Sequence, residues 1–194
     1  MKVAQLRKDI KELSQPALKG LGFTQVGELG EHFQVDENGN LVALLIEESK
    51  GNASFSISVR VFFRCENIES IFKEADPDSK YTLNKLLASE TINFDDYSRT
   101  KVESVLNSLI ENEAISFLNE YGSYGAIVSN LTKSDYREWI TSDKVAQFKV
   151  RLGSASLESD WKALAETKIE ASQFCEKPWA GPSKEVIRRL CAAV

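Results

Sequence analysis

The sequence predicts an α+β protein, with an N-terminal amphipathic helix, an antiparallel meander of three to four strands and a mainly helical C-terminal half. Two changes of pattern predict this order. Apolar residues recur every three or four positions near the N-terminus, and they alternate with polar residues between positions 32 and 64. The helical spacing then returns and continues to the C-terminal end of the sequence.

The first predicted helix covers residues 3–21. Pro16 lacks a backbone N–H and crowds the preceding turn, so we expect a kink or a break near residues 14–15. Gly20 and Gly22 are expected to end the helix. The apolar residues that share one helical face are Val3, Leu6, Ile10, Leu13, Ala17, Leu18 and Leu21.

Three strands are expected next, around Phe33 and Val35, from Leu41 onward, and at residues 54–64. Asn38-Gly39 predicts a two-residue hairpin turn between the first two, because both residues tolerate positive φ. In that register Asp36 lies opposite Leu41. The face expected to pack on the helix carries Phe33, Val35, Val42, Leu44, Ile46, Phe55, Ile57, Val59, Val61 and Phe63.

The opposite face of this sheet is the candidate binding surface. There Arg60 and His32 would meet carboxylates of a partner or ligand, and Phe62 would supply apolar area. The alternative is a sheet face that is only solvated or covered by a helix. The candidate binding residues are His32, Gln34, Glu47, Ser58, Arg60 and Phe62.

The rest of the chain is expected to be mainly helical. Residues 81–94 fit a helix or, at Thr91–Phe94, a fourth strand. Residues 97–121 fit one long helix or two abutting helices, and the turn Gly122–Gly125 follows. Further helices are predicted at 67–75, at 126–131, from Ser134, after an N-cap at Ser156, and from Ser183.

We expect a single domain over residues 1–194, made of a helix-and-sheet part (1–96) and a helical part (97–194). Whether residues after 131 form a small separate lobe stays open. A chain of this length buries roughly 70% of its unfolded surface, so its core needs no metal or disulfide. Trp139 and Trp161 are expected in the core. Trp179, between Pro178 and Pro182, is expected to be partly exposed or to hold the last loop in place.

Composition excludes several classes of protein. No apolar run approaches the roughly 20 residues that a membrane span needs, and the N-terminus lacks a signal-like stretch, so we expect a cytoplasmic protein. The net charge of −5 disfavours nucleic-acid binding. Three cysteines without Cys-x-x-Cys spacing indicate reduced thiols, with neither a metal site nor a cofactor.

The sequence contains no clear catalytic constellation. His32 is the only histidine, and the nucleotide-binding and zinc-hydrolase motifs are absent. Asp36, Glu48 and Lys50 imitate the Asp…Glu-x-Lys set of magnesium-dependent nucleases. The predicted hairpin, however, separates the two carboxylates by roughly 23 Å and puts them on opposite faces, too far apart to share one ion.

The segment Pro16–Phe23, the following hairpin, the Ser/Phe-alternating strand and the later Leu106, Phe117-Leu118 and Tyr121 carry a resemblance. In these features the stretch from Leu6 to Leu131 resembles a bacterial family known only as a domain of unknown function. The resemblance implies a helix ending in a Leu-Gly-Phe turn, an antiparallel sheet and trailing helices. It implies no catalytic residues.

The leading expectation is a non-enzymatic bacterial protein that binds another protein through the sheet face or a helix edge. One version is an immunity-type inhibitor of a basic toxin, since complementary charge accelerates encounter. The alternative is a small-molecule binder or an enzyme whose site combines Arg60, His32 and Glu47. A metal-dependent nuclease that uses Asp36, Glu48 and Lys50 stays open as a further alternative, since the hairpin register is itself a prediction. The oligomeric state stays open.

Overall fold

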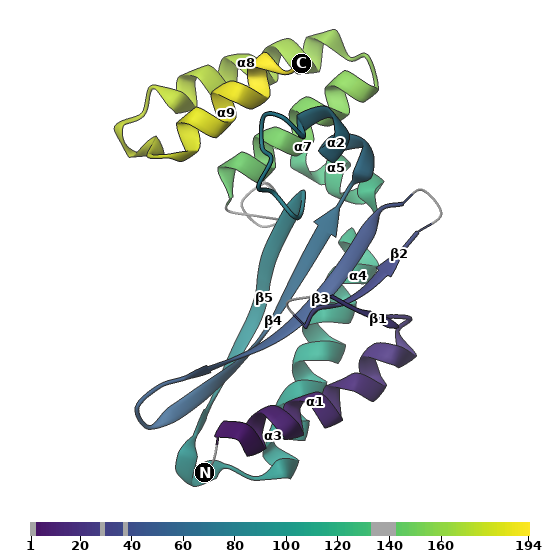
Figure 1. Ribbon diagram of the computed structural model, residues 1–194, viewed down its shortest axis with the longest axis vertical. Helices are drawn as coiled ribbons and strands as arrows, with labels where there is room; N and C mark the ends of the chain where they lie inside the picture. Colours follow the sequence, from purple (N-terminus) through teal and green to yellow (C-terminus); the bar gives the residue numbers. More distant parts are fainter. Residues whose placement is uncertain (1–2, 28–29, 37–38, 133–142) are drawn as a thin grey trace. The chain divides into compact units, whose positions relative to one another are not determined.

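The computed structural model describes residues 3–27, 30–36, 39–132 and 143–194, and it confirms the α+β class (Figure 1). A single antiparallel sheet has the strand order β1-β2-β3-β4-β5. Its strands are β1 (Gln25–Val26), β2 (His32–Val35), β3 (Leu41–Lys50), β4 (Ser54–Arg64) and β5 (Leu83–Asn93). The helices are α1 (Val3–Gly20), α2 (Glu66–Phe72), η1 (Phe94–Asp96), α3 (Arg99–Asn107), η2 (Ser108–Ala114), α4 (Ile115–Tyr121), α5 (Tyr124–Thr132), α7 (Lys144–Leu157), α8 (Trp161–Cys175), η4 (Pro178–Ala180) and α9 (Ser183–Ala192).

Helix α1 continues through Pro16, so the predicted break is wrong. Both Pro16 and Glu12, whose carbonyl loses its helical partner, are exposed, and water can satisfy that carbonyl. The helix ends as the Leu-Gly-Phe pattern implies. Phe23 N donates to Leu18 O at 3.0 Å and Gly22, with φ +89°, donates to Lys19 O at 3.0 Å. This Schellman motif buries Phe23 beside Leu18.

The hairpin between β2 and β3 has a register one residue away from the predicted one. Asp36 N donates to Asn40 O, and Asn40 N donates to the Asp36 side chain, both at 2.9 Å. These bonds enclose a three-residue loop with Gly39 at φ +79°. His32 is therefore opposite Leu44, and Val35 is opposite Leu41.

The one-residue shift moves every β2 side chain to the other face of the sheet. Phe33 and Val35 were expected in the core, but Phe33 is half-buried and Val35 is exposed. For β4, the prediction of which residues face inward is confirmed. Phe55, Ile57, Val59 and Val61 are all buried.

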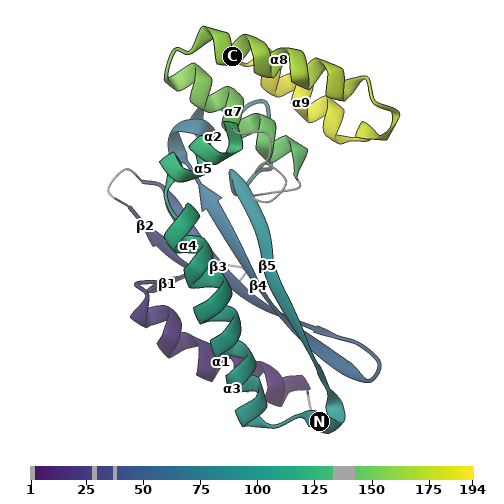
Figure 2. The ribbon, with the colours of Figure 1, turned by 180° about the vertical axis from the view of Figure 1, so that it is seen from behind.

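Strand β5 occupies the whole stretch Leu83–Asn93, so the ambiguous segment is a strand and not a helix. After η1, helices α3, η2 and α4 run on without interruption, as the long apolar pattern predicted. The middle segment η2 is a π-helix, in which Ile115 N donates to Ile110 O. Helix α1 and the α3–η2–α4 helix lie on the same face of the sheet (Figure 2).

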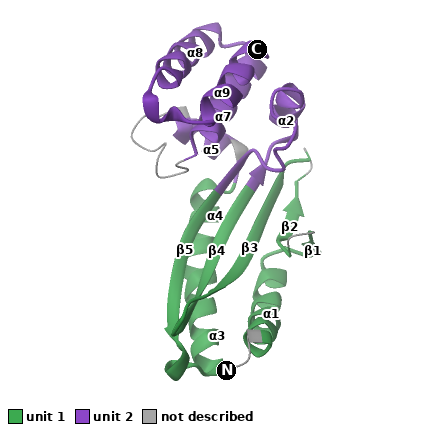
Figure 3. Ribbon diagram, turned by 60° about the vertical axis from the view of Figure 1, so that its left-hand side comes forward, with its two compact units in different colours: residues 1–62, 85–122 green, residues 63–84, 123–194 purple. Residues whose placement is uncertain are grey.

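The chain forms two compact units (Figure 3). Unit 1 comprises residues 1–62 and 85–122, and unit 2 comprises residues 63–84 and 123–194. Within unit 2, α7 contacts α2, α5, α8 and α9. The approach of α7 to α2 depends on Gly153, where an added Cβ would lie 3.0 Å from Ile68.

Three further predictions fall in unit 2. The helix expected after Ser156 instead begins at Trp161, because the Asp160 side chain accepts a bond from Ala163 N. Ser156 lies inside α7. Trp161 is 70% exposed, so its predicted place in the core is wrong, while the predicted exposure of Trp179 is confirmed at 69%. The helix predicted from Ser134 was expected to extend to Gly153. Its first part, with Trp139, lies outside the described residues, and its later part, with Val145, Phe148 and Leu152, is helical in α7.

No helix among the described residues combines the length and the apolar character needed to cross a membrane. Cys65, Cys175 and Cys191 are free thiols, as their spacing predicted.

Candidate functional site

The six predicted binding residues do not share one surface. His32 and Gln34 lie on the face of Leu44, which is the face that packs on α1. The turn bond from Gly51 N to Ser54 O sets the pairing of β3 with β4, and continuing that ladder places Glu47 opposite Ser58 on the outer face. The expected combination of His32 with Arg60 and Glu47 is therefore wrong, and its cause is the three-residue β2–β3 loop.

On the outer face, Arg60 and Glu47 form an ion pair with 3.4 Å between Nε and Oε2. Both side chains are partly exposed, and Ser58 beside them is half-buried. Phe62, expected to offer apolar area, is buried. Because the arginine already has a carboxylate partner from its own sheet, this face presents little uncompensated charge to a ligand.

His32 instead borders a cavity of about 570 Å³ between α1 and the sheet. Ile10, Leu18 and Ile46 contribute apolar wall, and Lys11 stands on the α1 side. Burial lowers the pKa of His32, and the positive charges of Lys11 and Lys19 lower it further. The imidazole is therefore neutral at pH 7. Arg7 and Glu48, which form an ion pair with each other, also line the cavity, so its border carries charges of both signs.

The nuclease-like set stays dispersed. Asp36 bonds to Asn40 at the hairpin, and Glu48 pairs with Arg7 of α1. The observed register puts the two carboxylates on the same face, contrary to the prediction, but about eight residues and roughly 26 Å apart along β3. Within the described ranges, no three His, Cys, Asp or Glu side chains are grouped as a metal site requires.

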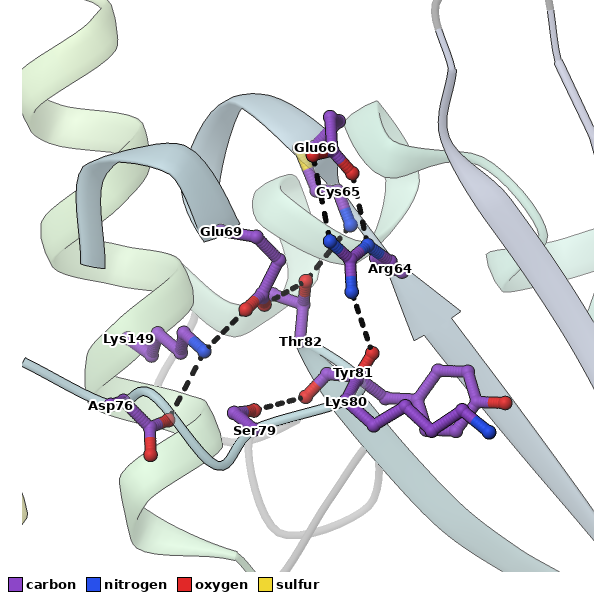
Figure 4. Close-up of polar contacts among 10 residues, drawn as sticks. All are labelled: Arg64, Cys65, Glu66, Glu69, Asp76, Ser79, Lys80, Tyr81, Thr82 and Lys149. Atoms are coloured by element: carbon purple, nitrogen blue, oxygen red, sulfur yellow. Dashed lines mark hydrogen bonds and ion pairs between the residues drawn. The ribbon is translucent and has the colours of Figure 1, made fainter. Parts of the chain in front are cut away.

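The most buried charged cluster of unit 2 was missed by sequence reasoning (Figure 4). Lys149 of α7 is 1% exposed, and its Nζ lies 2.7 Å from Glu69 Oε2 and 3.1 Å from Asp76 Oδ2. Thr82 donates its hydroxyl proton to Glu69 Oε1 at 2.5 Å and accepts from Cys65 N at 2.8 Å. We call Glu69, Asp76, Thr82 and Lys149 the lysine cluster.

The lysine cluster is internally satisfied. Its ammonium meets two carboxylates, and the second oxygen of Glu69 accepts the Thr82 hydroxyl. No buried side-chain nitrogen or oxygen among the described residues lacks a hydrogen-bond partner. Pairing of this kind stabilises buried charges, so we assign the cluster a structural role, although Asp76, Thr82 and Lys149 also border a cavity of about 480 Å³.

Unit 1 has its own buried carboxylate, Asp9 of α1, which is 2% exposed. Tyr97 donates its hydroxyl proton to Asp9, Gln5 donates at 2.8 Å, and Arg99 lies at 3.1 Å. The Tyr97 bond is the main reason that the pKa of Asp9 lies below its usual value. The same bond raises the pKa of Tyr97 to about 12.

Several exposed acidic residues lie on the outer side of the α3–η2–α4 helix. Its inward residues, such as Val102, Leu106 and Phe117, are buried. The acidic residues of the outer face, all exposed, are Glu103, Glu111, Glu113 and Glu120. The sequence has no Lys or Arg from position 102 to 132. We call these four glutamates and the helical surface between them the acidic face.

The π-helix η2 lies in the middle of the acidic face. Glu111, Asn112 and Glu113 are consecutive exposed residues within it, between the buried Ile110 and Ala114. π-Helical turns are less stable than α-helical turns and occur frequently at functional sites. The sequence did contain a signal for the acidic face, namely the long stretch without Lys or Arg. The net charge of the whole chain does not show where along the sequence the acidic residues are concentrated.

Comparisons with known proteins add no homologue, since no family model, no curated protein and no solved structure matches the chain.

Proposed function

We propose that this protein is a cytoplasmic, non-enzymatic protein-binding module, and that the acidic face binds a basic partner protein. The observation that carries the proposal is the distribution of charge. Unit 1 contains 10 Lys and Arg against 15 Asp and Glu, which is the whole net charge of −5, while unit 2 contains 14 of each.

Most of that charge is concentrated in one segment. Residues 85–122 contain 3 Lys and Arg and 7 Asp and Glu, a net charge of −4. Arg99, one of the three positive residues, is already engaged by Asp9 and Glu12. A surface of one sign raises the rate of encounter with a partner of the opposite sign and disfavours partners of the same sign.

An immunity-type inhibitor of a basic toxin is the version of this function that we favour. Such an inhibitor must bind quickly and needs no chemistry of its own, and charge complementarity supplies speed. The satisfied lysine cluster and the already paired Arg60 are consistent with a protein that works by binding.

The test compares two variants of equal charge change. In the first, Glu103, Glu111, Glu113 and Glu120 all become Gln. In the second, the control, four exposed glutamates of unit 2 become Gln: Glu74, Glu158, Glu176 and Glu185. Each protein, tandem-tagged, is expressed in its source cell and used to capture partners for mass spectrometry.

We expect the wild type and the control variant to retain the same basic protein in stoichiometric amount, and the acidic-face variant to lose it. Association of the purified pair should slow by roughly tenfold or more in the acidic-face variant at low salt. Expression of the partner alone should arrest growth, and co-expression with this protein should restore it. Equal retention by both variants, or the absence of any basic partner, contradicts the proposal.

A second candidate function is favoured by the cavity beside His32. Its size lies within the range of small-molecule sites, and its border joins an apolar wall to Lys11 and to Arg7, which is paired with Glu48. We propose a small amphipathic anion as the ligand, with its apolar part against Ile10 and Ile46 and its carboxylate near Lys11.

This second function predicts that octanoate raises the melting temperature of the wild-type protein. Lys11→Gln should reduce the rise, whereas Lys8→Gln should not, because Lys8 is on the same helix but does not line the cavity. No rise with octanoate, or an equal effect of the two substitutions, counts against the cavity as an anion site.

A further inference from the structure

Helix α8 of unit 2 has an exposed apolar stripe that its own fold does not use. Trp161 is 70% exposed, Ile169 is 59% exposed, and Ala165 between them is also exposed. These three residues are spaced four apart, so they lie along one side of the helix. The opposite side of α8 supplies the buried contacts, through Leu164, Thr167, Ala171 and Cys175.

One positive and one negative residue lie beside the stripe. Lys162 and Glu166 flank the same edge of the stripe, one helical turn apart, and are 86% and 62% exposed. Their distance within the chain is 4.0 Å, which is a weak surface pair. Both groups therefore stay accessible to a partner of complementary pattern.

We propose that the α8 stripe binds α8 of a second copy of this chain, antiparallel and about a two-fold axis close to Ala165. In this arrangement Trp161 of one copy packs on Ile169 of the other, and the two Ala165 residues allow the helices to approach closely. Lys162 of each copy lies beside Glu166 of the other. A two-fold contact requires such a self-complementary surface.

Charge selects a second copy as the occupant. The flanking Lys162 and Glu166 complement themselves under the two-fold rotation, and unit 2, which carries them, has no net charge. Unit 1, with a net charge of −5, would repel another unit 1. The contact of one helix with its copy is a small interface, and we expect a dissociation constant roughly in the micromolar range.

The first experiment is sedimentation velocity of the full chain over a range of concentrations. The wild type should shift from monomer to dimer as concentration rises, and Trp161→Ala should weaken the dimer by tenfold or more. Trp179→Ala is the matched control, because Trp179 is exposed to the same degree but lies in η4, outside the stripe. It should leave the dimer unchanged.

The charge pair gives a test that does not depend on removing apolar surface. Lys162→Glu and Glu166→Lys should each weaken the dimer, because each brings like charges together across the two-fold axis. The double variant with both substitutions should recover the wild-type dissociation constant. A chain that stays monomeric at millimolar concentration, a dimer insensitive to Trp161→Ala, or a double variant without recovery overturns the proposal.

Discussion

Each of the two units contains a buried charged group, but the oppositely charged partner of that group is exposed in unit 1 and buried in unit 2. In unit 1, Asp9 is buried and one of its partners, Arg99, is 52% exposed. In unit 2, Lys149 and Glu69 are both almost fully buried, at 1% and 8%. A centre whose counter-charge is in water can lose that partner cheaply, whereas a centre with both charges buried cannot lose either without leaving the other unpaired.

Removing the buried ammonium should have the largest effect. Lys149→Met leaves Glu69 and Asp76 without their shared cation inside unit 2. We expect the free energy of unfolding to fall by about 3–5 kcal/mol, measured by urea unfolding followed by circular dichroism. Lys177→Met, at an exposed site in the same unit, should change it by less than about 0.5 kcal/mol. Similar losses for both would contradict the comparison.

Removing the buried carboxylate of unit 1 should cost less. Asp9→Ala leaves the Tyr97 hydroxyl and the Gln5 amide without their acceptor. Both groups are near enough to the surface to recover water, so a loss of about 1–3 kcal/mol is expected in the same urea experiment. Glu103→Ala, at an exposed position of this unit, is the control. A loss as large as that of Lys149→Met would show that the two centres are equivalent.

Unit 1 should show an alkaline transition from its centre. The Tyr97 pKa of about 12 in the fold is above its ordinary value of 10.0, so the unfolded state loses its proton first as pH rises. The contribution of Tyr97 to stability is complete below pH 10 and declines between pH 10 and 12. Tyr97→Phe should remove this decline. An unchanged alkaline profile in Tyr97→Phe would exclude the hydrogen bond as its cause.

The same centre predicts a loss of stability at low pH as well, because the pKa of Asp9 is lowered whereas that of Tyr97 is raised. Asp9 has a pKa below its ordinary value of 3.8, so its contribution is present above that value and is lost as pH falls further. Asp9→Asn should therefore reduce stability at pH 7 and flatten the acid limb of the same unfolding series. A steeper acid limb in Asp9→Asn would contradict the assignment.

A helix cap in unit 2 gives a smaller effect. Asp160→Ala removes the bond from Ala163 N at the start of α8, at an expected cost of about 1 kcal/mol. Ser156→Ala should change stability by less than about 0.5 kcal/mol, because Ser156 is not an N-cap. Thermal unfolding of the two variants, measured side by side, shows which of the two residues caps α8.

The smallest effect is expected from Arg99→Gln. Its guanidinium is half-exposed and Asp9 keeps the bonds from Tyr97 and Gln5, so the melting temperature should fall less than in Lys149→Met, Asp9→Ala or Asp160→Ala. A loss comparable to that of Asp9→Ala would indicate that Arg99 is the main partner of the carboxylate.

Sequence patterns predicted the elements whose periodicity and burial agree. The alternation in β4 and the repeat in α1 each follow from one apolar face, and the structure confirms both. The pattern failed at β5, because Lys85, Leu86, Leu87 and Ala88 favour a helix and pairing in the sheet overrides that preference. The β2 register failed because Asp36 closes the loop with its own side chain, a local bond that residue spacing does not encode.

The charged centres were harder to predict than the elements. In the sequence, Lys149 looks like a surface lysine of a helix. The carboxylates that pair with it, Glu69 and Asp76, are distant in sequence. Lysine is so seldom buried that a single sequence favours solvent for it. The acidic face was within reach of prediction, because a run without Lys or Arg is visible in the order of the residues alone.

The exposed position of Trp161 and Trp179 has a practical consequence for spectroscopy. All three tryptophans of the sequence fall within residues 123–194, and residues 1–62 and 85–122 contain none. Indole fluorescence therefore reports on unit 2 alone, and unfolding of unit 1 must be followed by its tyrosines. Emission from an exposed indole shifts to shorter wavelength when a surface covers it, so concentration alone should change the spectrum if two copies meet through α8.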